Sequence, residues 1–364
     1  MRSTRVLITS PSLNVRENVS GISSLVADII RESSCTVMHF TLGSRDGEKK
    51  NLVWAFKQLF IYGKVIYISL VKKFGIVHLN VGLETFSIVR DSIVLFMMKK
   101  IFGKVVLLHV HGGYYLMHPP DKKIIAWFLR QLFRQSDAVI VLSEKEKKIL
   151  TERYGPRRFH VMPNAVNTAF ASHLQKEKGS GKIRLIFIGR ITGSKGIHTI
   201  SESFDYLTDY FDRFTFDIYG AGPELEKWKT GLARHENLQF TYNGVVGGID
   251  KWKALHKADI FLLPSIHSEG MPIAMIEAMA SGCVVIVTDD ASMGSLVSDN
   301  VNGILIGKNK PGELAGKLKE IINGRIDSSA ISLQAKRYVS ENFSIASYII
   351  QLDSLYTTLP TGTT

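Results

Sequence analysis

The sequence has 364 residues, of which 45% are hydrophobic, and a formal net charge of +12. This length is enough for two domains of ordinary size, and the composition excludes an extended disordered chain. No apolar run approaches the roughly 20 residues of a membrane-spanning helix, and Cys35 and Cys283 lie far apart without a metal-ligand pattern. We therefore expect no metal site and a reduced, cytoplasmic location.

The first half of the sequence alternates short apolar runs with segments of helical length. The apolar runs, which we interpret as buried strands, are Val6–Thr9, Thr36–Phe40, Ile76–Leu79, Val105–His109, Ala138–Leu142 and Phe159–Met162. Helices are expected between them, near residues 19–31, 49–73, 84–101, 121–135 and 144–153. Apolar strands that alternate with helices predict a parallel sheet covered on both faces.

The same pattern restarts after a polar, glycine-containing stretch, residues 171–182, that is typical of a linker. The strands predicted beyond it are Leu185–Ile188, Phe214–Ile218, Leu238–Thr241, Ile260–Leu263 and Val284–Val287. A last helix near 343–358 has apolar residues that could pack back across both units. The sequence thus predicts a domain at 1–170, a linker at 171–182, a domain at 183–342 and a returning helix in 343–364. Ligands of such sheets bind beyond the carboxyl ends of strands, so we expect a site in the cleft between the units.

Positive charge is concentrated in the first half of the chain. Residues 1–170 hold 25 Lys and Arg against 12 Asp and Glu, whereas residues 171–364 hold 20 against 21. Aromatic side chains lie among the lysines at 49–74, 96–104 and 122–134; they include Trp54, Phe56, Phe60, Trp127 and Phe128. For any one stretch, core-facing aromatics opposite solvated lysines are an equal alternative. For the whole half we predict association with an anionic membrane surface and not with nucleic acid, because no nucleic-acid module is recognisable.

The segment Ser265–Gly282 reads as a loop that turns into a helix after a buried strand. Gly270 permits a tight turn, and Pro272 suits the first helical position. The amides at that helix start can hold hydroxyls or phosphate oxygens. Glu269 lies beside these amides, and Glu277 lies about one and a half turns into the helix. The two carboxylates suit the hexose and the ribose of a nucleotide-sugar; two solvated helix glutamates are the alternative.

A second group of candidates follows the predicted strand Leu185–Ile188. Gly189 and Arg190 end this strand, and Lys195 with Gly196 opens the next helix. Two cations, glycine-rich backbone and a helix N-terminus suit a diphosphate and the charge that grows when it departs. The order of residues is not that of a Walker loop. A surface arginine and lysine in an ordinary turn are the alternative.

Three further motifs follow or precede predicted elements. Gly220 and Gly222 follow a strand, where they could let backbone approach a ligand or simply form a turn. Gly21, before the first long helix, could bring backbone amides near the diphosphate. His111 stands beside two glycines at a strand end, where it could orient sugar hydroxyls, whereas we expect His109 to be structural.

Together these residues resemble the family 4 (group 1) glycosyltransferases, from about residue 5 to residue 356. The matching segments are His111-Gly112, Met162 to Asn167, Ile188-Gly189-Arg190 with Lys195-Gly196, Gly220 to Pro223, and Ser268-Glu269-Gly270 through Glu277 to Ala280. The resemblance implies an α/β GT-B fold, with an acceptor-binding first unit and a second unit that binds the nucleotide-sugar. It also implies retention of anomeric configuration, no essential metal and no cofactor beyond the donor, a UDP-sugar or GDP-sugar.

By position in the family, Arg190 and Lys195 would hold the diphosphate and Glu277 the ribose. Glu269 and the amides of Gly270 and Met271 would hold the donor sugar, which His111 would face from the acceptor side. The catalytic candidates are thus Arg190, Lys195, Glu269 and His111, and the donor-binding candidates are Glu277, Gly270, Met271, Pro272, Gly189, Gly220, Gly222 and Gly21. Two positions depart from the pattern, because Ser20 replaces one glycine of a common pair and Ser295 replaces an acid.

These features predict transfer of a hexose or N-acetylhexosamine to a lipid-linked or glycan acceptor in cell-surface polysaccharide biosynthesis, such as that of lipopolysaccharide O-antigen or exopolysaccharide. The enzyme would act as a peripheral protein on the inner face of the cell membrane. We expect an oxocarbenium-like transition state in which Arg190 and Lys195 act on the departing charge. Phosphorolysis or epimerisation on the same fold, and a non-enzymatic basic membrane-binding protein, are the alternatives.

Overall fold

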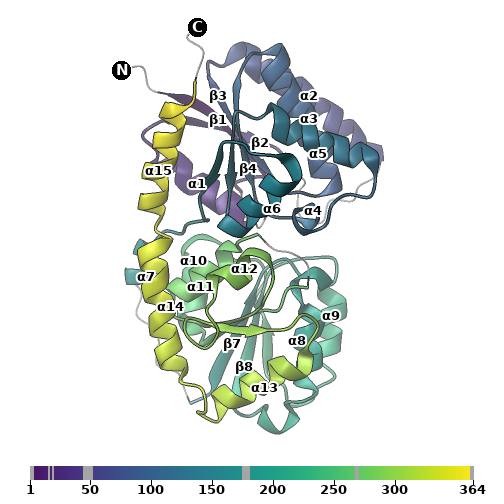
Figure 1. Ribbon diagram of the computed structural model, residues 1–364. Coiled ribbons are helices and arrows are strands. Elements are labelled where there is room, and N and C mark those ends of the chain that lie inside the picture. The colour runs from purple at the N-terminus through teal and green to yellow at the C-terminus, as the bar shows by residue number, and fades with distance from the viewer. Residues whose placement is uncertain are drawn as a thin grey trace. The chain divides into compact units, whose positions relative to one another are not determined.

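The computed structural model describes residues 4–14, 17–18, 20–43, 52–173, 181–266 and 270–360, without the side chains of 52–57, 172–173 and 291–292. The chain forms two compact units (Figure 1). Unit 1 comprises residues 1–164 and 346–364, and unit 2 comprises residues 165–345. The change from unit 1 to unit 2 thus falls between Asn164 and Ala165, ahead of the linker proposed at 171–182.

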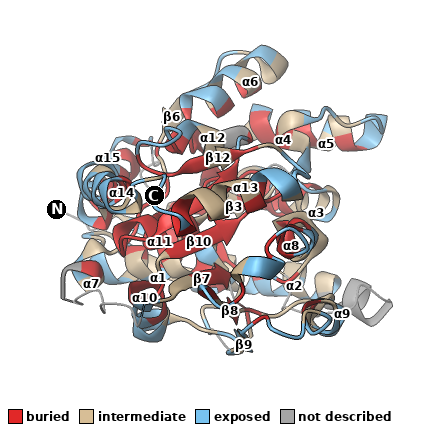
Figure 2. Ribbon diagram, turned by 90° about the horizontal axis from the view of Figure 1, so that it is seen from below, coloured by how far each residue is buried: buried red, intermediate tan, exposed pale blue. Residues whose placement is uncertain are grey.

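Unit 1 contains a six-stranded parallel sheet in the order β2-β1-β3-β4-β5-β6. Its strands are β1 (Arg5–Ser10), β2 (Thr36–Thr41), β3 (Ile76–Val81), β4 (Val105–Val110), β5 (Ala138–Val141) and β6 (Phe159–Val161). The four central strands, β1, β3, β4 and β5, are mostly buried, and Figure 2 colours buried residues red. All six strands predicted for the first half are present. Strands of a parallel sheet are covered on both faces, so they appear in the sequence as recognisable apolar runs.

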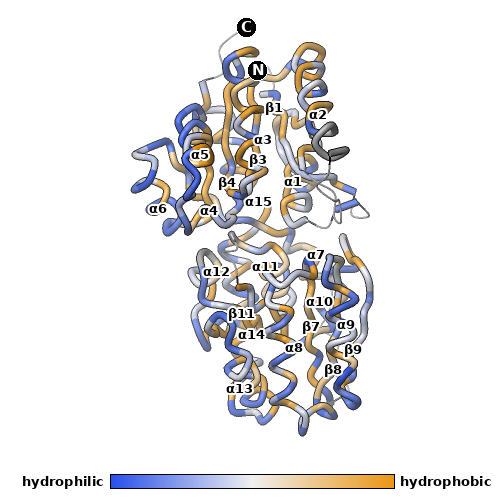
Figure 3. The backbone as a smooth tube through the Cα atoms, turned by 90° about the vertical axis from the view of Figure 1, so that its right-hand side faces the viewer, coloured by the Kyte–Doolittle hydropathy of each residue, from blue (hydrophilic) through white to orange (hydrophobic). Residues whose placement is uncertain are grey.

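Helices cover this sheet and form most of the surface of unit 1. They are α1 (Gly21–Glu32), α2 (Leu52–Val71), α3 (Thr85–Phe96), α4 (Tyr114–Met117), α5 (Lys123–Gln135), α6 (Glu144–Tyr154) and α15 (Ile345–Thr358), and a π-helical turn, η1 (Met97–Ile101), continues α3. Much of α2 is apolar (Figure 3). The last helix, α15, returns to unit 1: the carboxylate of Asp353 accepts hydrogen bonds from the hydroxyls of Ser33 and Ser34, so the predicted return is confirmed.

Unit 2 contains a second six-stranded parallel sheet, in the order β12-β11-β10-β7-β8-β9. Its strands are β7 (Ile183–Ile188), β8 (Phe214–Tyr219), β9 (Phe240–Tyr242), β10 (Ile260–Leu263), β11 (Val284–Thr288) and β12 (Ile304–Ile306). Five were predicted, although β9 begins two residues after the predicted Leu238. The edge strand β12 was missed, because three apolar residues do not make a recognisable period.

The helices of unit 2 connect these strands in the manner of a Rossmann-like fold. They are α7 (Thr168–His173), α8 (Ile197–Phe204), α9 (Leu225–Leu232), α10 (Gly248–Lys257), α11 (Ile273–Ala280), α12 (Ala291–Leu296), α13 (Pro311–Ile322) and α14 (Ser328–Asn342), with 3₁₀ turns η2 (Gly193–Lys195) and η3 (Thr208–Tyr210). The predicted linker is wrong at its start, which lies inside α7. Residues 174–180, its middle, lie outside the described residues.

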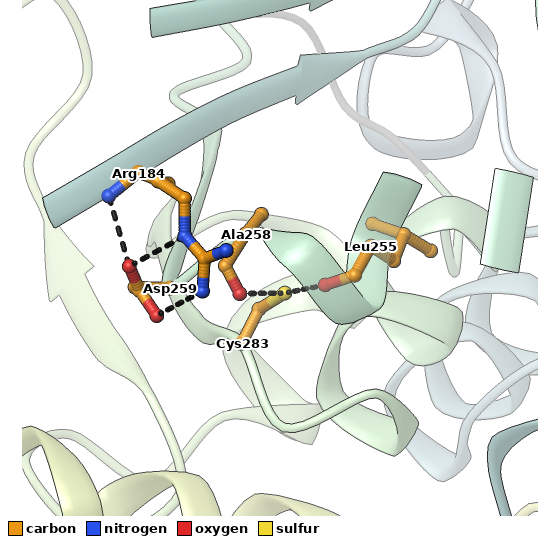
Figure 4. A network of polar contacts seen from close by, with 5 residues as sticks. All are labelled: Arg184, Leu255, Ala258, Asp259 and Cys283. Carbon is orange, nitrogen blue, oxygen red and sulfur yellow. Dashed lines mark hydrogen bonds and ion pairs between the residues drawn. The ribbon is translucent and has the colours of Figure 1, made fainter. Parts of the chain in front are cut away.

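The amino ends of the central strands of unit 2 are joined by a polar network (Figure 4). The guanidinium of Arg184 pairs with Asp259, Nε to Oδ2, at 3.3 Å, and the buried thiol of Cys283 donates to the carbonyl of Leu255 at 3.1 Å. A cavity of about 420 Å³ lies at this edge, where its lining includes Ile183 and Val284, the first residues of β7 and β11. Ligands of parallel sheets bind at the opposite edge.

Candidate functional site

The strand order of unit 2 reverses between β7 and β10. From β7 the chain proceeds to β8 on one side, whereas from β10 it proceeds to β11 on the other. Loops diverge beyond the carboxyl ends of strands at such a switch point, which makes it the usual ligand site of an open parallel sheet. Arg190 and Lys195 follow β7, and Glu277 lies in the helix after β10. The structure therefore brings these three candidates to the two connections that flank the switch point.

The turn after β7 and the loop after β10 pack directly on each other. The amide of Ile266 donates to the carbonyl of Ser194 at 3.0 Å. Gly196 has a φ of +76°, and a Cβ there would lie 1.9 Å from the carbonyl oxygen of Pro264. Only glycine fits this position without moving the backbone. The close approach of the two connections is therefore built into the sequence Lys195-Gly196.

The two cations of the β7 turn occupy different environments. Arg190 is exposed, whereas Lys195 is partly buried at the end of η2, where its amide donates to the carbonyl of Thr192. Helix α8 begins directly afterwards, and no side chain caps its start at Gly196. A helix N-terminus next to two cations favours an anionic ligand. The arrangement can accept a diphosphate.

A carboxylate that the sequence reasoning missed organises this turn. Glu224 accepts a hydrogen bond from the amide of Gly193, and its Oε2 lies 2.8 Å from Nε2 of His198. The hydrogen bond from Gly193 lowers the pKa of Glu224. The position of Glu224 directly after the Gly220–Pro223 motif was the available signal. Glu224 thus holds the turn after β7 in place from the connection that follows β8.

Gly220 and Gly222 have a structural explanation that needs no ligand. Gly220 has a φ of +140°, and a Cβ there would lie 1.9 Å from the carbonyl oxygen of Gly189. A Cβ at Gly222 would lie 2.1 Å from the carbonyl oxygen of Ile191. These glycines let the β8 turn pack against the β7 turn. A contact of either glycine with a ligand stays a prediction.

The structure describes some of the predicted site residues in the loop after β10, but not all of them. Glu269 lies outside the described residues. Gly270 and Met271 are buried directly before α11. Pro272 is the N-cap of α11, with φ −64° and ψ 118°, so its predicted place as the first helical residue is wrong by one position. Its ψ is extended, and the helix begins at Ile273.

Glu277 is the fifth residue of α11 and is only 5% exposed. Its Oε1 lies 2.6 Å from Nζ of Lys251 on α10, whose side chain is 11% exposed. The alternative of a solvated glutamate is therefore wrong for Glu277. Lys251 was not predicted, because it lies in a different helix and belongs to no motif. The pair places a buried carboxylate and its counter-ion on the helices that flank β10.

In unit 1, His111 follows β4 and is held by a neighbouring strand. Its amide donates to the carbonyl of Val81, and its Nε2 lies 2.7 Å from Oδ1 of Asn80. The amide nitrogen of Asn80 donates to the carbonyl of Thr9, so Oδ1 is the acceptor and Nε2 of His111 carries the proton. Burial lowers the pKa of His111. Its neutral imidazole thus has Nδ1 as an acceptor, which suits a hydroxyl donor. Gly21, the other unit 1 candidate, is the first residue of α1.

His109 is part of a fully buried column of polar rings in unit 1. Its Nδ1 lies 3.1 Å from Nε2 of His78, and Nδ1 of His78 lies 2.6 Å from the hydroxyl of Tyr356 on α15. Burial lowers the pKa of His78 to about 3 and that of His109 well below its ordinary value. Both imidazoles are neutral. His109 is thus structural, as predicted.

Among the residues described, no group of three or more His, Cys, Asp and Glu side chains is placed to bind a metal ion. No helix in the described part of the chain has the length and apolar character to cross a bilayer. Asp290, near the position where the family pattern departs, forms an ion pair with Lys308 at 2.8 Å.

Comparison with known families identifies the family to which the chain belongs. Residues 170–338 match the model of "Glycosyl transferases group 1", and residues 84–170 match that of "Glycosyltransferase Family 4". The chain belongs to the group 1 glycosyltransferases of family 4. The matched region of unit 2 includes both connections at the switch point, so the resemblance inferred from the sequence is confirmed.

Individual relatives are distant; AmsK is a glycosyltransferase by name, and the solved structures share the fold. The amylovoran biosynthesis glycosyltransferase AmsK of Erwinia amylovora is 26% identical over 227 residues, 59% of this chain and 54% of AmsK. Sucrose-phosphate synthase of Thermosynechococcus elongatus superposes with a TM-score of 0.79 at 16% identity, over 98% of this chain and 99% of its own. HepE of Anabaena, solved with UDP-glucose, gives 0.76 at 16% identity, over 98% and 100%. The fold is GT-B. The chain spans about half to two thirds of the length of the curated relatives that it matches first.

Proposed function

We propose that this glycosyltransferase moves a hexose or N-acetylhexosamine from a UDP-sugar or GDP-sugar to a lipid-linked or glycan acceptor. The observation that carries the proposal is the set of charged groups at the switch point of unit 2. Arg190 and Lys195 lie on one side of it, and the buried Glu277 lies on the other. Cations suit the diphosphate, and a carboxylate suits the ribose hydroxyls, because each accepts or donates charge-assisted hydrogen bonds.

Several features support the assignment of the donor to unit 2. The turn after β7 combines a helix N-terminus with two cations, an arrangement that favours the binding of an anion. The carboxylate of Glu277 is buried and its Oε1 lies 2.6 Å from Nζ of Lys251, so this acidic group is fixed in position on the helix after β10. HepE, which shares this fold, was solved with UDP-glucose and with UDP. These facts favour a uridine donor for the first tests.

The chemical step that we propose is retaining and does not depend on a metal ion. Bond breaking between the anomeric carbon and the diphosphate runs ahead of attack by the acceptor. Arg190 and Lys195 stabilise the charge that develops on the leaving group, and a phosphate oxygen takes the proton of the acceptor hydroxyl. Electrostatic stabilisation of this type accelerates the reaction because it strengthens as the transition state forms. His111, whose Nδ1 is an acceptor, binds a hydroxyl of the transferred sugar.

We propose an acceptor from cell-surface polysaccharide biosynthesis, because the relative AmsK is named for the biosynthesis of amylovoran. We propose that the acceptor is linked to a lipid, in which case it meets the enzyme at a membrane. The basic first half of the chain supports this, with 25 Lys and Arg against 12 Asp and Glu in residues 1–170. We therefore propose a peripheral enzyme on the cytoplasmic face of the cell membrane.

A panel of nucleotide-sugars tests the proposal directly. Donor binding raises the unfolding temperature by mass action, so one UDP-sugar or GDP-sugar should raise it while the corresponding free sugar should not. Incubation of that donor with a lipid extract should then release free nucleoside diphosphate and glycosylate a lipid. A flat panel would contradict the donor site, and release of a sugar phosphate would indicate phosphorolysis.

A further inference from the structure

The outward face of α2 is apolar, although this helix lies at the surface of unit 1. Val65 is buried, and Ile61, Tyr62 and Ile68 pack against the core on the same side. The opposite side carries large apolar residues with exposed fractions between 42% and 73%: Leu59, Phe60, Ile66, Tyr67, Leu70 and Val71. A surface helix normally presents charged side chains opposite its buried stripe. A contiguous exposed apolar surface of this kind marks an interaction site.

The charges on and around this face have one sign. Residues 49–83 contain six lysines and no Asp or Glu. Lys64 is exposed, with its Nζ 4.9 Å from the ring centroid of Phe60, and Lys72 and Lys73 are exposed directly after the helix. No ion pair of these three lysines is seen among the described residues. The exposed apolar residues are therefore interleaved with cations that have no acidic neighbours in sequence.

The same character continues onto η1, which contacts α2. The hydroxyl of Ser69 lies 3.5 Å from Sδ of Met98. Ile101, at the end of η1, is 62% exposed, and Lys100 beside it is exposed. Residues 92–120 contain three lysines and again no Asp or Glu. We call the exposed residues of α2 named above, with Lys64, Lys72, Lys73, Lys100 and Ile101, the α2 patch.

We propose that the α2 patch docks the protein onto an anionic membrane, with its lysines at the lipid headgroups and its apolar side chains in the interfacial layer. Interfacial helices combine an apolar face with lysines in this way. A second copy of this chain fits less well, because a two-fold contact would bring the same lysines face to face. The inference deepens the proposed function, since a lipid-linked acceptor lies in that membrane.

The experiment uses the full chain and two kinds of vesicle, phosphatidylcholine alone and phosphatidylcholine with phosphatidylglycerol. One variant neutralises charge, K64Q/K72Q/K73Q, and a second removes apolar contact, F60S/Y67S/L70S. Both change exposed residues, so the fold should persist, and circular dichroism checks this. The matched control is L333S/I350S, which alters equally exposed apolar residues on α14 and α15.

We expect the wild type and the control to co-sediment with the anionic vesicles and only weakly with the neutral ones. Each lysine near an anionic leaflet contributes roughly fivefold in partitioning, so the charge variant should lose about a hundredfold and the wild type should be released by salt. The apolar variant should also lose binding, including at low salt. Binding by either triple variant equal to that of the wild type would overturn the proposal.

Two other outcomes would also overturn it, and the first of them identifies another occupant. In the first, the wild type does not bind vesicles but forms a dimer, and the variant F60S/Y67S/L70S is monomeric. This result would assign the α2 patch to a contact with a second copy. In the second, the wild type does not bind vesicles and is monomeric, which would show that the α2 patch does not bind a membrane. A failure of membrane docking can be distinguished from a failure of the proposed function. Donor binding in the thermal panel involves unit 2 and is measured without vesicles.

Discussion

The carboxyl edges of the two sheets differ in charge although both sheets are six-stranded and parallel. At the unit 2 switch point the described residues include two cations, Arg190 and Lys195, and the buried pair of Lys251 and Glu277. The corresponding edge of unit 1 presents His111, which is neutral and bonded to an amide. The same architecture thus offers two cations and a buried ion pair in unit 2, whereas unit 1 offers a neutral imidazole and, after β3, the carboxylate of Glu84, which accepts a hydrogen bond from the amide of Tyr114.

This difference teaches where each part of a substrate can bind. A diphosphate needs cations and amides, which unit 2 provides at the turn after β7. Neutral imidazole and amide groups suit hydroxyls, which every sugar and glycan acceptor has. The sheets themselves are interchangeable scaffolds, and the connections decide the chemistry. Changes to the connections should therefore separate the two units experimentally, and the following predictions proceed from the largest effect to the smallest.

The charged side of the comparison is tested most strongly by Lys251→Met. Removal of one partner leaves the other buried charge uncompensated, which costs about 3–5 kcal/mol in typical cases. We expect a loss of this size in the unfolding free energy, measured by denaturant titration. The double variant K251M/E277Q should recover much of it, because no buried charge remains. Lys253→Met is the matched control on the same helix, where the side chain is 55% exposed; an equal loss there would contradict the argument.

Arg190→Ala and Lys195→Ala test the assignment of the diphosphate. Loss of an electrostatic contact with a leaving group costs about 10²–10³ in turnover. We expect kcat to fall by that factor and the donor KM to change less, since the contact strengthens in the transition state. Steady-state kinetics with the donor found in the thermal panel measures both. Arg325→Ala, another exposed arginine of unit 2, should leave kcat unchanged, and an equal fall there would indicate a general charge effect.

The strands and turns of both units were predicted well from the sequence, because the patterns that indicate them lie within a few neighbouring residues. Runs of apolar residues predicted eleven of the twelve strands in the described part of the chain, and glycine after a strand predicted the turns that hold Arg190 and Lys195. Contacts between distant segments were not accessible in the same way. Lys251 reaches Glu277 from another helix, and Glu224 reaches Gly193 from the next connection. Their charges are visible in the sequence, but their partners depend on how the helices pack.

The neutral, buried histidines of unit 1 are tested by measuring how the stability of this unit depends on pH. Burial lowers the pKa of His78 to about 3, and that of His109 is lowered as well. Below a pH of about 6.5 the unfolded chain takes up protons that the folded imidazoles do not. Unit 1 should therefore lose stability as the pH falls from about 6.5 toward 3, by up to about 1.4 kcal/mol per pH unit for each histidine.

Hydrogen exchange at two pH values separates the units within one molecule. After correction for the intrinsic exchange rates, amides of β3 and β4 should lose more protection between pH 7 and pH 5 than those of β8 and β10. The variant H78L/H109L should have a smaller pH dependence in unit 1, even if its stability at neutral pH is lower. Equal losses of protection in the two units would show that these histidines do not govern the acid response.

The smallest effect concerns α15, which belongs to unit 1 although it follows unit 2 in the chain. The carboxylate of Asp353 accepts hydrogen bonds from the amide and the hydroxyl of Ser34 and from the hydroxyl of Ser33, at 2.5–2.7 Å. These contacts are partly exposed, so Asp353→Ala should cost about 1 kcal/mol. The loss should appear as faster hydrogen exchange in α15 and at the end of α1, with unit 2 unchanged. Glu341→Ala removes an exposed ion pair with Arg337 and should cost less, because solvent screens such a pair. If Asp353→Ala had no larger effect than this control, α15 would be held to unit 1 by its buried apolar residues alone.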